Sequence, residues 1–460
     1  MSATDFTSGL LTMRNYYESG VTKKYDFRKK QLQLLKETVL KYEKEIYNAL
    51  YTDLKKSPEE SYATELGLIL AEVNGALKNL HKWMTPKRAR VELVNLPSSG
   101  KIYRDPLGVV LIIAPWNYPL QLLFIPLIAA VAGGNCVVLK PSEFAPATAA
   151  ISEKIISEVF SKEYIDIVQG DGAQLIPEMM QSFRFDHIFY TGSIPVGKII
   201  YQSAAKDLIP VTLELGGKSP AVIEPDANIT AAARRITLGK FVNAGQTCIA
   251  PDYVLVHESV KEKFVSAMKE MIKKFFDDNA QESYSYGKII NEKRFDKLTS
   301  YLKQGKILTG GETDKEQLFI APTLIENVSI DSPVMQDEIF GPVLPIITFN
   351  KMDDVLKIIQ KNPNPLSFYL FTSDSSKEKE WMSNVAFGGG CINNTAWHFA
   401  NHSFPFGGIG NSGIGAYHGK YGFDTFTHAK AVMKTPTWFD PAIKYPPFKG
   451  KLKWYKRFIR

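Results

Sequence analysis

The spacing of hydrophobic positions changes along the chain. In residues 25–54 and 58–83, apolar side chains recur at helical spacing among charged ones, which predicts amphipathic helices. From residue 107 onward the apolar positions become continuous: residues 108–114 and 136–139 are short runs, with an apolar stretch of helical length, 121–132, between them. Runs without polar alternation are typical of parallel strands that helices cover on both faces. Residues 107–140 are therefore predicted to form a β-α-β unit.

Further apolar runs extend this pattern into two units. Residues 165–168 and 187–190 are expected to add strands to the first sheet. A second α/β series begins near Ser219, with strands at 253–256 and 343–347 and a basic amphipathic helix at 258–275. We therefore predict an α/β fold: a doubly wound, Rossmann-like nucleotide-binding domain of residues 1–87 and 107–216, and a second α/β domain of residues 217–411. Between these units, residues 91–96 and 101–104 flank the turn sequence Pro97-Ser98-Ser99-Gly100, which predicts a hairpin of exposed strands.

The long apolar stretch of residues 107–139 is not predicted to cross a membrane. Three prolines and two polar residues interrupt it, so no run of about 20 apolar residues remains. The first 30 residues also lack the apolar core of a secretory signal. A buried α/β core is the better interpretation.

Composition narrows the class of ligand. The 460 residues carry a net charge of +7, spread along the chain, which suits small anionic ligands and argues against nucleic acid. The three cysteines, Cys136, Cys248 and Cys391, include no C-x-x-C pair, so no disulfide framework is predicted. We instead expect the reducing environment of the cytoplasm. The seven histidines show no metal-ligand spacing, so no metal is expected.

One of these cysteines, Cys248, follows a turn of small residues, Asn243-Ala244-Gly245-Gln246-Thr247. Small residues let the backbone and a ligand approach closely, and a backbone N–H beside the sulfur can stabilise an oxyanion. A free thiol has a pKa of about 8.5 and needs a suitable neighbour to become nucleophilic near pH 7. Taken alone, Cys248 fits a buried structural cysteine better than a nucleophile.

Two polar residues could complete a catalytic site. Glu214 lies among apolar neighbours, where partial desolvation would raise its pKa toward the range of a general base. The alternative is a strand-end glutamate paired with Lys218. Asn117 follows the strand of residues 108–114 at its carboxyl end, where open α/β sheets place ligands, and its amide could donate to an oxyanion. Alternatively, Asn117 only satisfies the backbone of a turn between two prolines.

Two further segments suit a nucleotide. Lys140 and Glu143 follow a strand, and they could hold the two hydroxyls of an adenosine ribose or simply form a solvated ion pair. Residues 192–199 almost match the phosphate-binding loop G-x-x-x-x-G-K-[ST], but Ile199 replaces the magnesium-binding hydroxyl, so a triphosphatase is disfavoured. A strand followed by a glycine and a helix N-terminus is still a suitable binding site for a pyrophosphate.

Seven motifs occur in one order: P-W-N-Y-P (115–119), L-K-P-S-E (139–143), F-Y-T-G-S (189–193), L-E-L-G-G-K (213–218), N-A-G-Q-T-C (243–248), E-I-F-G-P (338–342) and P-F-G-G-I-G-N-S-G (405–413). Each motif alone is weak to moderate, but the ordered set resembles the aldehyde dehydrogenase superfamily. Residues 415–428 resemble its class 3 branch, which acts on fatty and aromatic aldehydes. So does the short N-terminus, which lacks the leading segment of the larger tetrameric classes.

The resemblance implies NAD(P)-dependent oxidation of an aldehyde to its acid by the second domain. Cys248 would be the nucleophile, Glu214 the base that activates the deacylating water, and Asn117 an oxyanion donor together with the Cys248 N–H. NAD, with NADP also possible, would contact Lys140, Glu143, Gly192, Ser193, Gly197, Glu338 and Phe340. An apolar tunnel for aliphatic or aromatic aldehydes would be lined by Tyr118, Leu122, Leu238, Val242, Phe399 and Phe406.

The resemblance also implies an assembly. Class 3 relatives are similar in being dimers joined by a protruding hairpin and a C-terminal segment, so residues 88–106 and 412–445 would be the bridging and oligomerisation elements of a homodimer. Residues 446–460 form a basic, aromatic tail without an acidic residue, too short and too charged for a membrane anchor. Weak contact with anionic lipid is one expectation for this tail, and a solvated or subunit-packed segment is the other.

Other classes remain as alternatives. A cysteine hydrolase would need a histidine as the base for its thiol, whereas the motif partner here is Glu214. A CoA-acylating dehydrogenase shares the thioester but usually lacks this glutamate, so water is the expected acceptor. A non-catalytic protein that keeps only the fold is disfavoured by the intact Cys248, Glu214 and Asn117.

Overall fold

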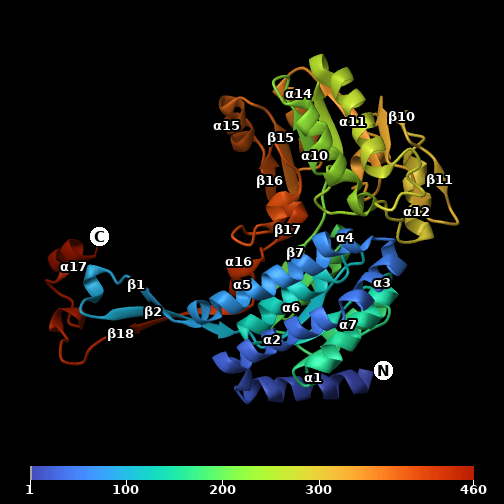
Figure 1. Cartoon of the computed structure of the whole chain (residues 1–460). Coiled ribbons are helices and arrows are strands. Elements are labelled where there is room, and N and C mark those ends of the chain that lie inside the picture. The colour runs from blue at the N-terminus through green and yellow to red at the C-terminus, as the bar shows by residue number, and fades with distance from the viewer. Residues whose placement is uncertain (1–2, 460) are drawn as a thin grey trace.

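The computed structural model describes residues 3–459, and two largely parallel sheets organise most of them (Figure 1). The first sheet has the strand order β5-β4-β3-β6-β7, which is the order of a doubly wound nucleotide-binding sheet. A short strand, β17, is added antiparallel beside β7. The strands of this sheet are β3 (Val109–Ile113), β4 (Cys136–Lys140), β5 (Ile165–Ile167), β6 (His187–Thr191), β7 (Val211–Glu214) and β17 (Gly413–Ile414).

The continuous apolar runs of the sequence form the centre of this sheet, as predicted. Every residue of β3, β4 and β6 is buried, because helices cover both faces. The helix between β3 and β4, α6 (Gln121–Gly133), is buried along its whole length, Pro126 included. Among residues 3–459, no helix is both long enough and apolar enough to span a membrane.

Amphipathic helices surround the first sheet (Figure 1). The helical stretch predicted in residues 25–54 is a pair of helices, and the one predicted in residues 58–83 is divided into two α-helices with a π-helix between them. A further helix that the sequence pattern did not predict, α1, packs its buried Phe6, Leu10 and Met13 into the same hydrophobic core. The helices are α1 (Ala3–Glu18), α2 (Tyr25–Lys41), α3 (Glu43–Leu54), α4 (Pro58–Ser61), the π-helix η2 (Tyr62–Leu66), α5 (Gly67–Met84), α7 (Pro146–Val159), α8 (Gly172–Ser182) and α9 (Ile194–Ala205).

The second sheet has its own hydrophobic core. Its strands are parallel except for β10, which pairs antiparallel at one edge. In order across the sheet they are β10 (Lys306–Thr309), β13 (Thr323–Glu326), β14 (Val343–Phe349), β9 (Tyr253–His257), β8 (Pro220–Ile223), β15 (Ser367–Phe371) and β16 (Gly389–Ile392). The accompanying helices are α10 (Ile229–Phe241), α11 (Lys261–Phe276), α12 (Glu292–Tyr301), α13 (Pro333–Gln336), α14 (Met352–Lys361) and α15 (Ser375–Asn384). The prediction of an α/β fold with two sheets is confirmed.

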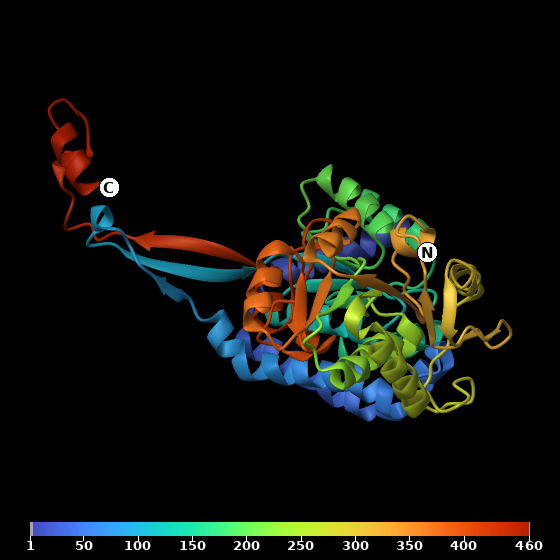
Figure 2. The same ribbon diagram turned by 90° about the horizontal axis from the view of Figure 1, so that it is seen from above.

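A third sheet forms an arm that projects from the body (Figures 1 and 2). The predicted hairpin exists, but its first strand was misplaced: β1 is Lys87–Ala89, and the 3-10 turn η3 (Leu93–Asn95) replaces the expected strand at 91–96. Leu93 is 76 % exposed, so the apolar positions there mark no buried strand face. The second strand, β2 (Ser99–Pro106), pairs on its other side with β18 (Thr427–Lys434).

The C-terminal segment continues from β18 to the tip of this arm, where the short helix α17 (Leu452–Phe458) lies (Figures 1 and 2). The predicted tail of residues 446–460 therefore lies apart from the two sheets. Its last residue, Arg460, falls outside the described residues.

Candidate active site

The turn that carries Cys248 is held in an uncommon backbone conformation. Asn243, Ala244 and Gly245 all have left-handed φ angles, of 52°, 49° and 74°. A Cβ on Gly245 would lie 2.3 Å from the carbonyl oxygen of Gly341, so only glycine fits there. Left-handed non-glycine residues cost on the order of 1–3 kcal/mol each and cluster at functional sites. The predicted small-residue turn thus leads from α10 directly to the thiol.

The Cys248 thiol is half-buried, and its surroundings favour the protonated form. Burial raises the pKa of this thiol most strongly, and the carboxylates of Glu338 and Glu214 raise it further. Hydrogen bonds from the backbone N–H groups of Cys248 and Ile249 act in the opposite direction. These two N–H groups are the local donors that favour a charged sulfur.

Glu214 ends β7 and is only 2 % exposed. Neither of its carboxylate oxygens has a hydrogen-bond partner within residues 3–459, and burial raises the pKa of this carboxyl well above its usual value. The alternative in which Glu214 pairs with Lys218 is wrong, because Lys218 forms a buried ion pair with Asp252. An unpartnered buried carboxyl of this kind suits proton transfer.

Asn117 lies between the first sheet and the Cys248 turn. Its Nδ2 donates to the carbonyl oxygen of Gln246 at 3.0 Å, and its own carbonyl accepts from Asn243 Nδ2 at 2.8 Å. Lys56 Nζ donates to the same carbonyl at 3.0 Å. The Asn117 amide is therefore held beside Gln246, which precedes Cys248 by two residues in the chain. Asn117 is not one of the residues that line the cavity around the thiol.

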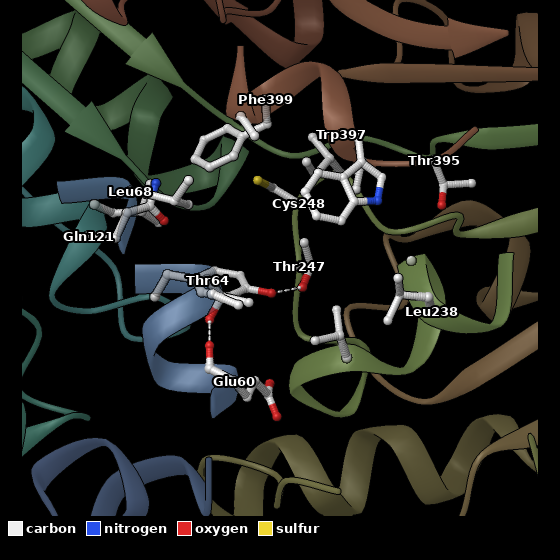
Figure 3. A pocket seen from close by; sticks show the side chains of 18 of the residues that line it. Glu60, Thr64, Leu68, Gln121, Leu238, Thr247, Cys248, Thr395, Trp397 and Phe399 are labelled. Atoms are coloured by element: carbon white, nitrogen blue, oxygen red, sulfur yellow. Dashed lines mark hydrogen bonds between the residues drawn. The ribbon is translucent and has the colours of Figure 1, made fainter. Parts of the chain in front are cut away.

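A cavity of about 670 Å³ has both Cys248 and Glu214 in its lining. Figure 3 shows Cys248 and several of its neighbours in this cavity. Cys248 lies beside Phe399 and Trp397 in this view, and Glu60 and Thr64 lie below it. All six residues expected to form a substrate tunnel line this cavity: Tyr118, Leu122, Leu238, Val242, Phe399 and Phe406. Tyr118 is fixed there by a 2.6 Å hydrogen bond with Thr247. Most of the lining side chains are apolar.

The residues expected to hold a nucleotide lie at the carboxyl edge of the first sheet. Lys140 ends β4, and its buried Nζ donates to Glu143 at 3.0 Å. Burial disfavours the charged Glu143 carboxylate, but hydrogen bonds from backbone N–H groups and from Lys140 outweigh it and lower the pKa. Gly192 follows β6, Ser193 is the N-cap of α9, and Gly197 lies in the first turn of that helix.

Glu338 approaches the same region from the second sheet. A Cβ on Gly216 would lie 2.0 Å from Glu338 Oε2, so a larger residue there would displace the Glu338 carboxylate. Burial, and secondarily Asp252, raise the pKa of Glu338 to about 8. Asp252 also accepts the Ile339 N–H at 2.9 Å, which anchors the loop. Phe340 stacks edge-to-face on Trp116, with ring centroids 5.3 Å apart.

Sequence patterns did not identify several charged groups that support the site. Lys56 and Glu65 form a fully buried ion pair of 2.6 Å, and Glu65 Oε2 accepts the N–H groups of Leu120 and Gln121 at the start of α6. Lys240 is buried with no partner among the described residues, and burial lowers its pKa to about 8. Lys56 lies in the connection between α3 and α4, Glu65 on η2 and Lys240 on α10, so no shared local motif marks these groups.

Comparisons with known proteins agree with this geometry. Residues 21–432 match the model of the aldehyde dehydrogenase family. The chain is 45 % identical to 4,4'-diaponeurosporen-aldehyde dehydrogenase of Staphylococcus aureus, over 97 % of each chain. It is 42 % identical to aldehyde dehydrogenase family 3 member A2 of Macaca fascicularis, over 97 % of this chain and 92 % of that one.

Solved structures show the same fold. A substrate-bound Staphylococcus aureus AldH superposes with a TM-score of 0.95 at 44 % identity, covering 98 % of this chain and 99 % of that one. An NAD-dependent aldehyde dehydrogenase of Sinorhizobium meliloti gives 0.85 at 26 % identity, covering 96 % and 88 %. A glyceraldehyde-3-phosphate dehydrogenase of Methanocaldococcus jannaschii complexed with NADP gives 0.85 at 25 % identity, covering 95 % of each chain. The chain therefore belongs to the aldehyde dehydrogenase family and resembles its class 3 members.

Proposed function

We propose that this aldehyde dehydrogenase oxidises apolar aldehydes, aliphatic of medium or long chain or aromatic, to carboxylic acids through a thioester on Cys248 that water releases. One observation carries the proposal: a single, mainly apolar cavity holds both a thiol and an unpartnered buried carboxyl, Glu214. The thiol suits covalent attack on a carbonyl, and the carboxyl suits activation of water.

In the proposed reaction, the Cys248 thiol loses its proton to solvent, and the thiolate attacks the aldehyde carbonyl, forming a C–S bond and a tetrahedral oxyanion. The Cys248 N–H and Asn117 Nδ2 are the donors assigned to that oxyanion, because the amide lies beside the turn that carries the thiol. The oxyanion then collapses with loss of hydride, leaving the thioester. Glu214 removes a proton from water, the water attacks the thioester, and the carboxylic acid leaves with the thiolate restored.

The residues of the first sheet fit a dinucleotide, and we propose NAD, with NADP also accepted. The cofactor supplies the hydride acceptor when it is bound. Gly192 and Ser193 lead into α9, whose first N–H groups have no partners within the helix, a suitable seat for a pyrophosphate. Lys140 and Glu143 are assigned to the adenosine ribose, Glu338 to the nicotinamide ribose, and Phe340 to the neighbourhood of the nicotinamide. The structurally similar Sinorhizobium enzyme is named NAD-dependent, and the Methanocaldococcus one is complexed with NADP.

The ionised carboxylate of Glu143 would accept a ribose hydroxyl and repel a 2′-phosphate. In Glu143→Gln, the ratio of kcat/KM for NAD to that for NADP should therefore fall by about 10–100-fold, since a hydrogen bond to a charged group is worth about 1.5–3 kcal/mol. Initial rates with each cofactor measure this ratio. Glu178→Gln, at a glutamate on α8 that makes an exposed hydrogen bond with Gln174, is the matched control. An unchanged ratio in Glu143→Gln would remove Glu143 from the ribose site.

Loss of the Asn117 amide should lower kcat by about 10²–10³ with little change in KM, because it removes one of two oxyanion donors. Steady-state kinetics of Asn117→Ala measure the effect. Asn243→Gly is the control for the turn: it removes a side-chain donor to the Gln246 and Asn117 carbonyls but leaves the Asn117 amide, at a left-handed position that glycine tolerates. If both variants lose the same activity, Asn117 only supports the turn.

The apolar cavity supports apolar aldehydes as substrates. Initial rates with hexanal, decanal and benzaldehyde, each with NAD and with NADP, test this assignment directly. The proposal expects higher kcat/KM for these aldehydes than for small polar ones such as glycolaldehyde. Preference for glycolaldehyde, or ester hydrolysis without any aldehyde-dependent reduction of NAD, would contradict it.

A cysteine hydrolase would need a histidine as the base for Cys248. His398 instead contacts Cys391, which does not favour this alternative.

We further propose that residues 1–87 and 107–216 form the domain that binds the cofactor and that residues 217–411 form the domain that carries the thiol.

The projecting arm supports a homodimer built through residues 88–106 and 412–445, which sedimentation velocity would test. The three unpaired cysteines support a cytoplasmic location.

The tail presents lysines together with the exposed apolar Leu452 and Ile459, which supports weak, salt-sensitive contact with anionic lipid. Cosedimentation with vesicles of anionic and of neutral lipid tests this contact. Equal binding by a chain truncated after Tyr445 would contradict it.

A further inference from the structure

Three side chains with metal-binding atoms meet next to the cavity wall, outside the Cys248 site. They are Glu72 on α5, His402 in the loop after the 3-10 turn η6 (Trp397–Ala400), and His418, which precedes α16 (Gly419–Thr425). One ligand atom from each lies within 4.8 Å of the others. Glu72 Oε2 accepts from His402 Nδ1 at 2.7 Å, and Glu72 Oε1 accepts from the Gly419 N–H at 2.8 Å.

His418 is the member of this cluster whose polar atoms are unsatisfied. It is 1 % exposed, and neither ring nitrogen has a hydrogen-bond partner among the described residues. Such a buried, unpaired imidazole costs on the order of 1–3 kcal/mol and calls for a physical explanation. Its backbone is also left-handed, with a φ of 80°. The ring is enclosed by Phe399, Phe406 and Tyr417, with centroid distances of 4.8, 5.6 and 4.4 Å.

We propose that Glu72, His402 and His418 bind a divalent transition-metal ion such as Zn²⁺. Two imidazole nitrogens and one carboxylate oxygen are a suitable donor set for Zn²⁺. Tetrahedral zinc ligands lie about 3.4 Å apart at the usual bond lengths. Glu72 Oε2 and His402 Nδ1, now 2.7 Å apart, would therefore separate slightly as the ion enters between them. His402 can make this movement because its side chain is 29 % exposed, and solvent on that side supplies the fourth ligand.

The hydrogen bonding of the cluster is compatible with binding. Both ring nitrogens of His418 are without a hydrogen-bond partner among the described residues, so either one can act as a ligand. The ion would replace the hydrogen bond between His402 Nδ1 and Glu72 Oε2.

The bound ion would connect α5 to the wall of the substrate cavity. Phe399 and Phe406 line that cavity and also pack on the His418 ring. Glu72, His402 and His418 are not among the residues that line the cavity of Cys248. The site is therefore separate from the proposed reaction and can be tested with protein that has no activity.

The first test measures Zn²⁺ binding to the full chain carrying Cys248→Ser, which removes the cavity thiol as a competing metal ligand. After treatment with a chelator, the protein is titrated with Zn²⁺ in competition with a chromophoric chelator. One ion per chain is expected. Loss of a direct ligand should cost more than the 10–100-fold typical of an outer-shell change, so Glu72→Gln and His402→Gln should each weaken binding by at least about 100-fold.

His257→Gln is the matched control, because His257 ends β9 and hydrogen-bonds Ser259, away from this cluster. It should bind Zn²⁺ as tightly as the parent. Crystals of the Cys248→Ser protein soaked in Zn²⁺ provide a second measurement that needs no ligand variant, since anomalous scattering locates the ion. A peak between Glu72, His402 and His418 supports the proposal. Unchanged affinity in both ligand variants, or an anomalous map without a peak at these residues, overturns it.

Discussion

Replacing Cys248 with alanine is expected to lower aldehyde-dependent formation of NADH by about 10⁴–10⁶-fold. The variant cannot form the C–S bond that holds the substrate during oxidation, and loss of a covalent nucleophile typically has an effect of this size. The rate of NAD reduction with decanal, measured at saturating cofactor, gives the result. The thiol lies in a cavity rather than in a packed core, so the fold should be retained.

Cys391→Ala is the matched control for this prediction. Cys391 is also half-buried, and it contacts His398 at 3.5 Å, but it lies on β16 and does not line the cavity. Its loss should leave most of the activity. A Cys248→Ala protein that reduces NAD as fast as the wild type would show that the proposed mechanism is wrong.

Glu214→Gln is expected to separate oxidation from hydrolysis. The substitution keeps the shape of the side chain but removes the base, so hydrolysis of the thioester should slow by about 10²–10⁴-fold. Attack by Cys248 should survive, because removing a neighbouring carboxylate lowers the pKa of the thiol. Rapid mixing should then show a burst of about one NADH per active site followed by slow turnover.

The pH dependence of this step follows from the raised pKa of Glu214. The charged, basic form becomes populated only as pH rises through that raised value, so the deacylation rate of the wild type should increase with pH. Glutamine does not titrate, and the increase should disappear in the variant. A Glu214→Gln protein with wild-type steady-state rate and the same pH profile would exclude Glu214 as the base.

The centre of the fold could be predicted from hydrophobic spacing because its strands are buried on both faces. β3, β4 and β6 appear in the sequence as unbroken apolar runs, and each began within one residue of its expected position. The arm could not be predicted in the same way. Leu93 and Leu96 are exposed, so their spacing does not follow a buried face, and β1 was misplaced by several residues.

The residues of the candidate site could be predicted where they belong to a short sequence motif. Cys248 and Glu214 are embedded in short, distinctive segments, and the structure brings them to one cavity. Interacting residues that are distant in the sequence are not marked by a motif of this kind. Lys218 reaches Asp252 across 34 residues, and Glu72 reaches His402 across 330. Those pairs depend on how the two sheets and the loops pack, which residue spacing does not encode.

The central claim is that the substrate is carried as a thioester on Cys248 and released by water that Glu214 activates. The most direct measurement is mass spectrometry of the Glu214→Gln protein, quenched in acid after incubation with decanal and NAD. The account predicts an added decanoyl group on the peptide that contains Cys248, and none when NAD is omitted. An unmodified Cys248 peptide, or a decanoyl group on Cys391 instead, would contradict it.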